Sequence, residues 1–247
     1  MADWHPVTSG ESGARVYRSA DATVFRKVVE IDRAAALADE RDRIRWACAH
    51  GVPGPVVLDW RTDSTTAELV TSAVAGVPAD RLTRQAFADA WPAIVDAVRD
   101  LHALPVTDCP HRRDVATMLT TARDVVARDA VDPDFLPDED RGVPPAALLA
   151  RVEAQAALRR RQEEGDLVVC HGDLCLPNIV VDGTAIGFVD LGRLGGADRH
   201  ADLSLLLEST AQTFPGFESH EALVDRYPWP VDDDRLRFYL WLDPLTW

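Results

Sequence analysis

The chain has 247 residues, of which 47% are hydrophobic and 27% are charged. This balance is typical of a globular protein that buries a sizeable core, in one large domain or two small ones. The formal net charge of −15 argues against a nucleic-acid-binding protein, because such proteins present basic surfaces to phosphate. An acidic chain is compatible with a cationic small-molecule partner.

The sequence also bears on the compartment. It contains no apolar run of membrane-spanning length, and its first residues, MADWHPVTSGESG, lack the basic start and apolar core of a secretory signal. The four cysteines show no CxxC spacing, which predicts free thiols in reducing surroundings. We therefore expect a cytoplasmic protein that does not bind membranes. The sequence leaves the oligomeric state open, with a monomer favoured.

The N-terminal third predicts a small antiparallel sheet with one helix. A glycine turn, which contains Gly10, Ser12 and Gly13, precedes two short alternating strands over 14–19 and 23–28. A helix rich in Ala, Arg and Glu is expected over 32–50, and strands are expected over 56–61 and 67–72. Small residues over 73–76 then suggest a hinge.

The remainder predicts a mainly helical lobe. Helices are expected over 84–103, 113–130 and 146–164, with a Pro- and Asp-rich loop before the third. The segment 168–193 is expected to form a strand, a loop, a second strand and a turn. The tail from Asp202 to Trp247 is expected to be helical, with breaks at Pro215, Pro228 and Pro230. We therefore predict lobes over 1–72 and 77–247, joined by the hinge over 73–76.

The segment VVCHGDLCLPNIVVDGTAIGFVDLGR (168–193) carries three acceptor side chains, Asp173, Asn178 and Asp190, among apolar and small residues. A buried carboxylate without a partner is costly, so a cation is expected beside them. Protein kinases use D-x-x-x-x-N followed by D-x-G, in which the first aspartate accepts the proton of the attacking hydroxyl and the other two residues bind Mg²⁺. The spacing therefore predicts Asp173 as the catalytic base and Asn178 and Asp190 as metal ligands.

The other parts of a kinase site lie upstream. Lys27 is the single lysine among 26 basic residues, and an ammonium on a strand is suited to holding the phosphates of ATP. Glu40, on the predicted helix, is expected to pair with Lys27, and the turn with Gly10, Ser12 and Gly13 is expected to cover the phosphates. This set predicts an α+β, bilobal, protein-kinase-like fold with an N-terminal antiparallel sheet lobe and a mainly helical C-terminal lobe.

Two residues are expected to support the loop rather than to react. A histidine in a catalytic loop usually braces the backbone, which is the role that we expect for His171. Asp202 is expected either to brace the same loop or to cap the helix that begins near ADLSLLL.

The run HGDLCLPNIVVD…GFVDLGRLGGADRHADL resembles the signature of the aminoglycoside O-phosphotransferases. Within that family, WHPVTSGESG, AGVPADRL, VDPDFLPDED and FYLWLDPLTW are similar to segments of the streptomycin 3''-phosphotransferases. The resemblance implies ATP and Mg²⁺ as cosubstrates and phosphorylation of the 3''-hydroxyl of streptomycin, which inactivates the antibiotic. It also implies that Arg193 orients the catalytic loop and that Ser72, Ala73 and Val74 offer backbone hydrogen bonds to adenine.

The sequence departs from the 3'-phosphotransferases of neomycin-type drugs. Gln212, Thr213 and Pro244 occupy places at which those enzymes carry acidic residues, and this favours a cation of a different shape. Streptomycin carries guanidinium groups, for which carboxylates are natural bidentate partners. The candidates are Asp243, Glu208 and the acidic residues of the loop over 134–140, represented by Asp134.

Two alternatives remain open. In the first, the same fold phosphorylates another aminoglycoside or a small hydroxylated metabolite, such as a choline- or homoserine-like alcohol. In the second, the chain is a nucleotide-binding module without transferase activity, although a module of that kind does not need the full set of catalytic residues.

Overall fold

The structure, a computed structural model, describes residues 4–7 and 14–247. The predicted glycine turn with Gly10, Ser12 and Gly13 lies outside the described residues. The chain forms two compact units, one from residues 1–82 and 177–193 and the other from residues 83–176 and 194–247. The segment 177–193 groups with the N-terminal residues because its strands pair with the chain just after residue 76. The lobe boundaries given above remain a prediction.

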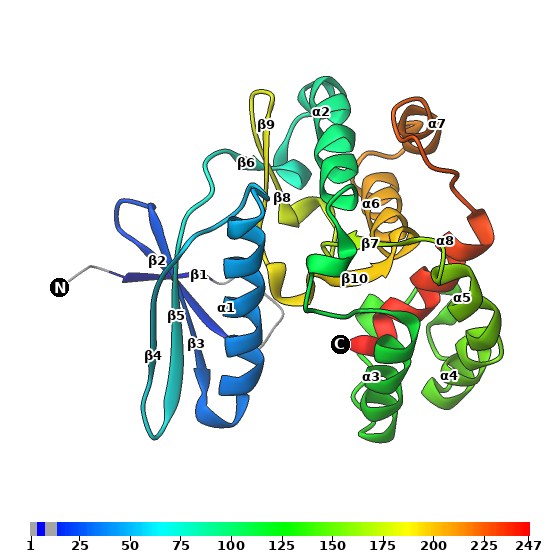
Figure 1. The fold of residues 1–247 in the computed structure, drawn as a ribbon, viewed down its shortest axis with the longest axis horizontal. Helices are drawn as coiled ribbons and strands as arrows, with labels where there is room; N and C mark the ends of the chain where they lie inside the picture. Colours follow the sequence, from blue (N-terminus) through cyan, green and yellow to red (C-terminus); the bar gives the residue numbers. More distant parts are fainter. Residues whose placement is uncertain (1–3, 8–13) are drawn as a thin grey trace. The chain divides into compact units, whose positions relative to one another are not determined.

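The first unit contains a five-stranded antiparallel sheet with the strand order β1-β2-β3-β5-β4 (Figure 1). The sheet was predicted except for β1, a short edge strand that contains Pro6. Proline is tolerated at an edge because its missing N–H leaves no gap in the ladder. The strands are β1 (Trp4–Val7), β2 (Arg15–Ser19), β3 (Val24–Glu30), β4 (Val57–Thr62) and β5 (Thr66–Ser72).

Helix α1 (Ala34–Ala49) packs against this sheet. The helix was predicted over 32–50, and the structure forms a 3₁₀ turn over Ile31–Arg33 before it. Its buried side chains, Leu37, Ile44 and Ala47, lie on one side, and the buried Ala67 and Leu69 belong to β5. The helix stops at Gly51, whose φ of +76° is a conformation that glycine adopts readily after a helix.

A second sheet completes the first unit. It contains β6 (Val77–Pro78), β8 (Ile179–Asp182) and β9 (Ala185–Phe188) in the order β6-β8-β9. The predicted hinge residues lie tightly against it. A Cβ on Gly187 would approach Val74 Cγ1 to 2.5 Å, and a Cβ on Gly76, which has φ +124°, would approach the Val181 carbonyl oxygen to 2.5 Å. Glycine is therefore required at position 76, whereas a larger residue at position 187 would displace the Val74 side chain.

The second unit is mainly helical, with one antiparallel strand pair, β7 (Leu167–Cys170) and β10 (Gly195–Asp198). Its core is formed by apolar side chains that are almost fully inaccessible, such as Met118, Leu148 and Phe238. The helices are α2 (Arg84–His102), α3 (Val115–Ala127), α4 (Pro145–Glu153), α5 (Ala156–Glu163), α6 (Arg199–Thr213), α7 (Ser219–Val224) and α8 (Asp233–Leu242).

Two helix predictions for this unit need correction. The single helix expected over 146–164 is two helices, α4 and α5, with a break between Glu153 and Ala156. Beside the break, the buried Arg159 donates to the Gln155 side chain and to the Asp234 carbonyl, and the second of these bonds is long-range and has no local sequence signal. Helix α6 begins at Arg199, before Asp202, because the Asp198 carboxylate accepts the His200 N–H as the N-cap.

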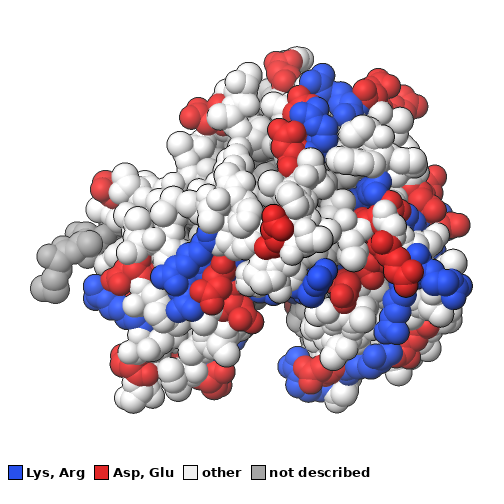
Figure 2. Space-filling model, in the orientation of Figure 1, with Lys and Arg blue, Asp and Glu red and all other residues white. Residues whose placement is uncertain are grey.

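The surface carries both signs of charge. Figure 2 shows acidic and basic side chains interspersed on the face drawn. Among the described residues, no helix has the length and apolar character that a membrane crossing requires.

Candidate active site

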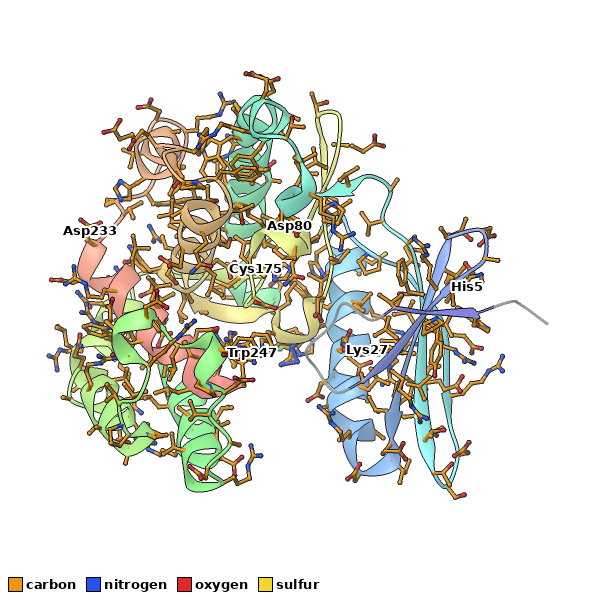
Figure 3. The ribbon with its side chains drawn as sticks, turned by 180° about the vertical axis from the view of Figure 1, so that it is seen from behind. His5, Lys27, Asp80, Cys175, Asp233 and Trp247 are labelled. Atoms are coloured by element: carbon orange, nitrogen blue, oxygen red, sulfur yellow. The ribbon has the colours of Figure 1, made fainter. Side chains whose placement is uncertain are left out.

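Lys27, Glu40 and Asp190 come together within the first unit. Lys27 Nζ donates to Glu40 Oε2 at 2.8 Å and lies 3.7 Å from Asp190 Oδ1. Strand β3 places Lys27 opposite helix α1, which carries Glu40 (Figure 3). Burial alone lowers the pKa of Lys27, but the two carboxylates outweigh it and hold the pKa above its usual value. The ammonium therefore stays charged, as phosphate binding requires.

The turn after β9 places Asp190 in this group. Asp190 has a φ of +57°, which is uncommon for a residue with a side chain. The Val189 N–H donates to the Asn178 carbonyl at 3.0 Å, so the two predicted metal-ligand segments are joined by their backbones. A Cβ on Gly192 would lie 3.5 Å from Glu40 Cγ, which shows how closely the following 3₁₀ turn, Leu191–Arg193, packs on α1.

Asn178 and Asp190 have the donor chemistry for a hard divalent cation. Mg²⁺ prefers oxygen ligands and is usually held by one or two carboxylates together with phosphate oxygens. The side chain of Asp190 is 50% exposed although Lys27 beside it is 19% exposed, so its carboxylate is accessible to an ion. Both residues therefore fit a magnesium site.

The second unit holds the predicted base in a loop after β7. Asp202, on α6, accepts the His171 N–H at 2.6 Å and the Gly172 N–H at 2.8 Å. His171 Nδ1 in turn accepts the Asp173 N–H at 3.2 Å. These bonds confirm that His171 and Asp202 brace the loop, whereas the capping alternative for Asp202 is wrong because Asp198 is the cap. The backbone at Asp173 is therefore fixed independently of its carboxylate.

Sequence reasoning missed two residues that support this loop. His102, at the end of α2, lies with Nε2 3.1 Å from Asp202 Oδ2, and its Nδ1 lies 2.5 Å from the Tyr227 hydroxyl. Burial raises the pKa of Asp202, but the bonds from His102 and the loop amides outweigh it, and the pKa is below its usual value. The carboxylate therefore stays ionised inside the protein. His102 and Asp202 are 100 residues apart, so no local pattern connects them.

The predicted adenine contacts are unequal. The Ser72 N–H donates to the Val56 carbonyl at 2.9 Å, and the Ala73 N–H donates to the Thr23 carbonyl at 2.8 Å. Neither N–H group is available to adenine unless the sheet opens. This counts against the prediction that the Ser72 and Ala73 amides donate to adenine. Val74 remains the candidate of the three.

The predicted substrate residues have different surroundings. Asp243 is buried and accepts from Arg113 at 2.6 Å and from Trp247 Nε1 at 3.0 Å. Glu208 is exposed and accepts from the Gln212 side chain. Asp134 is also exposed, in the 3₁₀ turn Pro133–Phe135.

The loop over 134–140 lies beside the end of the chain within the second unit. The ring of Phe135 is 5.4 Å from that of Trp247, which Figure 3 labels at the C-terminus. Two of the four sequence segments that resemble the streptomycin subgroup, VDPDFLPDED and FYLWLDPLTW, are therefore neighbours. Arg193, which the sequence predicts to orient the catalytic loop, is half-buried at the end of the 3₁₀ turn after Asp190.

Comparisons with known proteins extend this description. A family model described as the phosphotransferase enzyme family matches residues 3–239. The streptomycin 3''-kinase of Streptomyces griseus is 56% identical over 252 residues, which cover 99% of this chain and 93% of that protein. The aminoglycoside 3'-phosphotransferase of Streptomyces fradiae is 39% identical and covers 98% of this chain and 94% of its own length.

Solved structures of aminoglycoside phosphotransferases are also similar to this chain. The aminoglycoside phosphotransferase APH(3'')-Id of Streptomyces rimosus superposes with a TM-score of 0.96 at 51% identity, over 100% of this chain and 93% of that chain. The structure of the same enzyme in complex with ADP and streptomycin gives a TM-score of 0.94 at 50% identity, with the same coverage. The predicted kinase-like α+β fold is confirmed. The chain belongs to the phosphotransferase enzyme family, within which it is similar to the aminoglycoside phosphotransferases, as its signature segments predict.

Proposed function

We propose that this protein transfers the γ-phosphoryl group of ATP to the 3''-hydroxyl of streptomycin and so inactivates the antibiotic. The observation that carries the proposal is the 56% identity to the streptomycin 3''-kinase of Streptomyces griseus over nearly the whole chain. The charged, paired Lys27 and the braced Asp173 loop support it, since phosphoryl transfer depends mainly on positioning and electrostatics.

Asp173 acts as the general base in this proposal. Its carboxylate accepts the hydrogen bond of the attacking hydroxyl and then its proton. The hydroxyl oxygen forms the new bond to the γ-phosphorus while the bond from that phosphorus to the bridging oxygen breaks, and ADP leaves with the bridging oxygen. The bonds that fix the backbone of the loop at His171 and Gly172 support this role, because a base works only at a fixed distance from its proton.

Lys27 holds phosphate oxygens of ATP, and Glu40 keeps the ammonium in place. The compact, charged ammonium suits this role as a point charge. Val74 offers its backbone to adenine, the predicted turn with Gly10, Ser12 and Gly13 covers the phosphates, and Arg193 orients the catalytic loop.

Asn178 and Asp190 would hold Mg²⁺. When bound, the ion neutralises negative charge on the phosphates, which lowers the cost of bringing a nucleophile to them. The two segments support this assignment through their oxygen donors and through the bond between Val189 and the Asn178 carbonyl.

Carboxylates of the second unit bind the guanidinium groups of streptomycin in this proposal. Glu208 and Asp134 are exposed and can accept bidentate bonds. Asp243 is different because Arg113 and Trp247 already use its oxygens. We therefore propose that Asp243 shapes the substrate pocket by fixing the end of the chain, while Glu208 and Asp134 are the better candidates for direct contact.

The cysteines support a cytoplasmic location, which we also propose. In the described part of the chain, Cys48, Cys109, Cys170 and Cys175 are not joined by disulfides, a state that reducing compartments maintain. A monomer that acts on a small-molecule substrate remains our expectation.

The decisive experiment is mass spectrometry of streptomycin after incubation with the protein, ATP and Mg²⁺. The expected product carries one added phosphate, and NMR of that product locates it at the 3'' position. In parallel, the protein is incubated with ATP, Mg²⁺ and each of a panel of other aminoglycosides and choline- and homoserine-like alcohols, and ADP release is measured for each acceptor. Phosphorylation of a different alcohol with none of streptomycin would overturn the substrate assignment, and no ADP release with any acceptor would overturn the transferase assignment.

A further inference from the structure

A chain of buried polar side chains runs from the segment after α7 to the loop that carries Asp173. Tyr227 and His102 are each 3% exposed, and Asp202 is 0% exposed. The Tyr227 hydroxyl contacts His102 Nδ1, His102 Nε2 contacts Asp202 Oδ2, and Asp202 accepts the His171 and Gly172 amides. Every link lies within the second unit.

The direction of each hydrogen bond follows from chemistry. The ionised Asp202 carboxylate only accepts, so His102 must carry a proton on Nε2 to bond it. Burial raises the pKa of Tyr227 far above its usual range, so its hydroxyl keeps a proton to donate. When that proton is donated to Nδ1, the imidazole is held in the tautomer that presents Nε2–H to Asp202.

The same cluster contains the thiol of Cys170, and the side-chain ligand atoms of His102, Cys170 and Asp202 lie within 4.8 Å of one another. Three observations favour hydrogen bonding over metal binding. Both Asp202 oxygens accept backbone amides, both ring nitrogens of His102 have partners, and Cys170 Sγ lies 3.5 Å from the Asp198 carbonyl. Burial also raises the pKa of Cys170, which disfavours the thiolate that a metal needs.

We propose that Tyr227 and His102 are positioning residues for phosphoryl transfer. Tyr227 sets the tautomer of His102, and His102 orients Asp202. Asp202 then fixes the His171 and Gly172 amides, and the reacting geometry of Asp173 depends on the position of these amides. The inference rests on the proposed role of Asp173 as the base. Both residues are buried and therefore out of reach of a substrate, so we expect a defect in either one to change the turnover rate rather than the binding of ATP or acceptor.

The structure offers a matched control for the tyrosine. Tyr239 is also buried, and among the described residues its hydroxyl has no hydrogen-bond partner. Tyr227→Phe and Tyr239→Phe therefore remove the same atom from similarly buried rings, but only the first removes a bond from the chain. We expect Tyr227→Phe to lower kcat on the order of tenfold, because small displacements of a catalytic group are costly, with both KM values within twofold. Tyr239→Phe should leave kcat unchanged.

Variants of His102 test the middle link. Gln places an amide N–H near the position of Nε2, whereas Leu offers no donor, so His102→Gln should recover most of the kcat that His102→Leu loses. If His102→Gln and His102→Leu lose the same kcat, or if KM changes in place of kcat, the positioning role is wrong. Equal kcat for the wild type and Tyr227→Phe, measured well below the melting temperature, would also overturn it.

A measurement that needs no phosphoryl acceptor tests this inference separately from the proposed function. Hydrogen exchange of the His171 and Gly172 amides, measured in the protein with ADP, should be faster in Tyr227→Phe than in Tyr239→Phe. If exchange is faster in Tyr227→Phe but the wild type does not phosphorylate streptomycin, the proposed substrate is wrong and the positioning role of Tyr227 and His102 is supported. Unchanged exchange would reject the chain even if streptomycin is phosphorylated.

Discussion

Lys27 and Glu40 form a buried ion pair in which Nζ and Oε2 are 2.8 Å apart, and their side chains are 19% and 13% exposed. The pair joins the central strand of the five-stranded sheet to α1. Breaking a buried pair from one side leaves an uncompensated charge, which costs more than removing both partners together. Under the proposed function, Lys27 thus has two separable contributions, one to the free energy of unfolding and one to catalysis.

A double-mutant cycle separates these contributions. Lys27→Met should destabilise the protein by about 3 kcal/mol because the Glu40 charge loses its partner, and Glu40→Leu added to it should restore most of that loss. Activity should stay low in the double variant, since the phosphate-binding ammonium is absent. Urea titration and kcat measurements provide the data, and a double variant no more stable than Lys27→Met would contradict the expectation.

Lys27→Arg is a milder change at the same position. Arg keeps the positive charge but replaces a compact ammonium with a planar, larger group. We expect a loss in kcat of about tenfold, equivalent to about 1.4 kcal/mol of transition-state stabilisation, with little change in the unfolding midpoint. Wild-type kcat in this variant would show that the site needs only a charge.

Asp173→Asn removes the proposed base while nearly preserving shape. The loop backbone is held by His171 and Asp202, so stability should change little. We expect kcat to fall on the order of 10²–10⁴-fold because an amide cannot take the hydroxyl proton. Calorimetric titration should show ADP affinity close to that of the wild type. A small effect on kcat would mean that Asp173 is not the base.

Asp190 allows metal binding to be tested apart from backbone strain. Asn tolerates the left-handed φ of +57° that this position adopts, whereas Ala in that region costs about 1 kcal/mol. Asp190→Asn should therefore lose the Mg²⁺ dependence of ADP affinity with little loss of stability, and Asp190→Ala should lose both. Titrations with ADP in the presence of Mg²⁺ or EDTA measure the first property, and thermal melting measures the second. Retained Mg²⁺ dependence in Asp190→Asn would exclude this residue as a ligand.

The buried carboxyl group of Glu163 should make the free energy of unfolding depend on pH. Burial raises its pKa from 4.5 to about 7, although its carboxylate accepts the Val115 N–H. The folded protein then holds the proton more tightly than the unfolded chain, so this contribution to stability is present below about pH 4.5 and decreases as the pH rises to about 7. The total is on the order of 2–3 kcal/mol.

Glu163→Gln should flatten this part of the profile and raise the free energy of unfolding at pH 8, because a neutral amide has no charge to bury. Its neighbour Glu164 is exposed, so Glu164→Gln serves as the matched control and should leave the profile unchanged. Urea midpoints measured between pH 5 and pH 8 provide the comparison. Parallel profiles for Glu163→Gln and the wild type would reject the assignment.

Residues that are near each other in the chain were the most predictable. The period-2 strands, the helix after them and the spacing from Asp173 to Asp190 all appear in the sequence, because they depend on local patterns. Lys27 and Glu40 were paired correctly since a strand followed by a helix brings such residues together. The bracing role of His171 was predictable for the same reason, because its ring accepts a hydrogen bond from the Asp173 N–H, only two residues away.

Long-range bonds were not predictable in the same way. Tyr227 and His102 are 125 residues apart, and a lone buried histidine has no pattern that names its partner. Arg159, which follows the break between α4 and α5, donates to the distant Asp234 carbonyl, and no local pattern indicates that bond. Asp243 was expected to bind a guanidinium group, and the structure pairs it with the guanidinium of Arg113. The pairing of Asp243 with Arg113, 130 residues away in the chain, was not predicted, and the role of Asp243 toward the substrate stays a prediction.

The single lysine gives the protein a selective chemical label. An amine-directed acylating reagent has only one side-chain target here, Lys27, and that target is largely shielded by its own fold. Nucleotide occupancy should shield it further, so the extent of acylation, read by peptide mass mapping, becomes a footprint of the phosphate-binding end of the molecule. In a lysine-rich kinase such a footprint would be lost among many labelled surface positions.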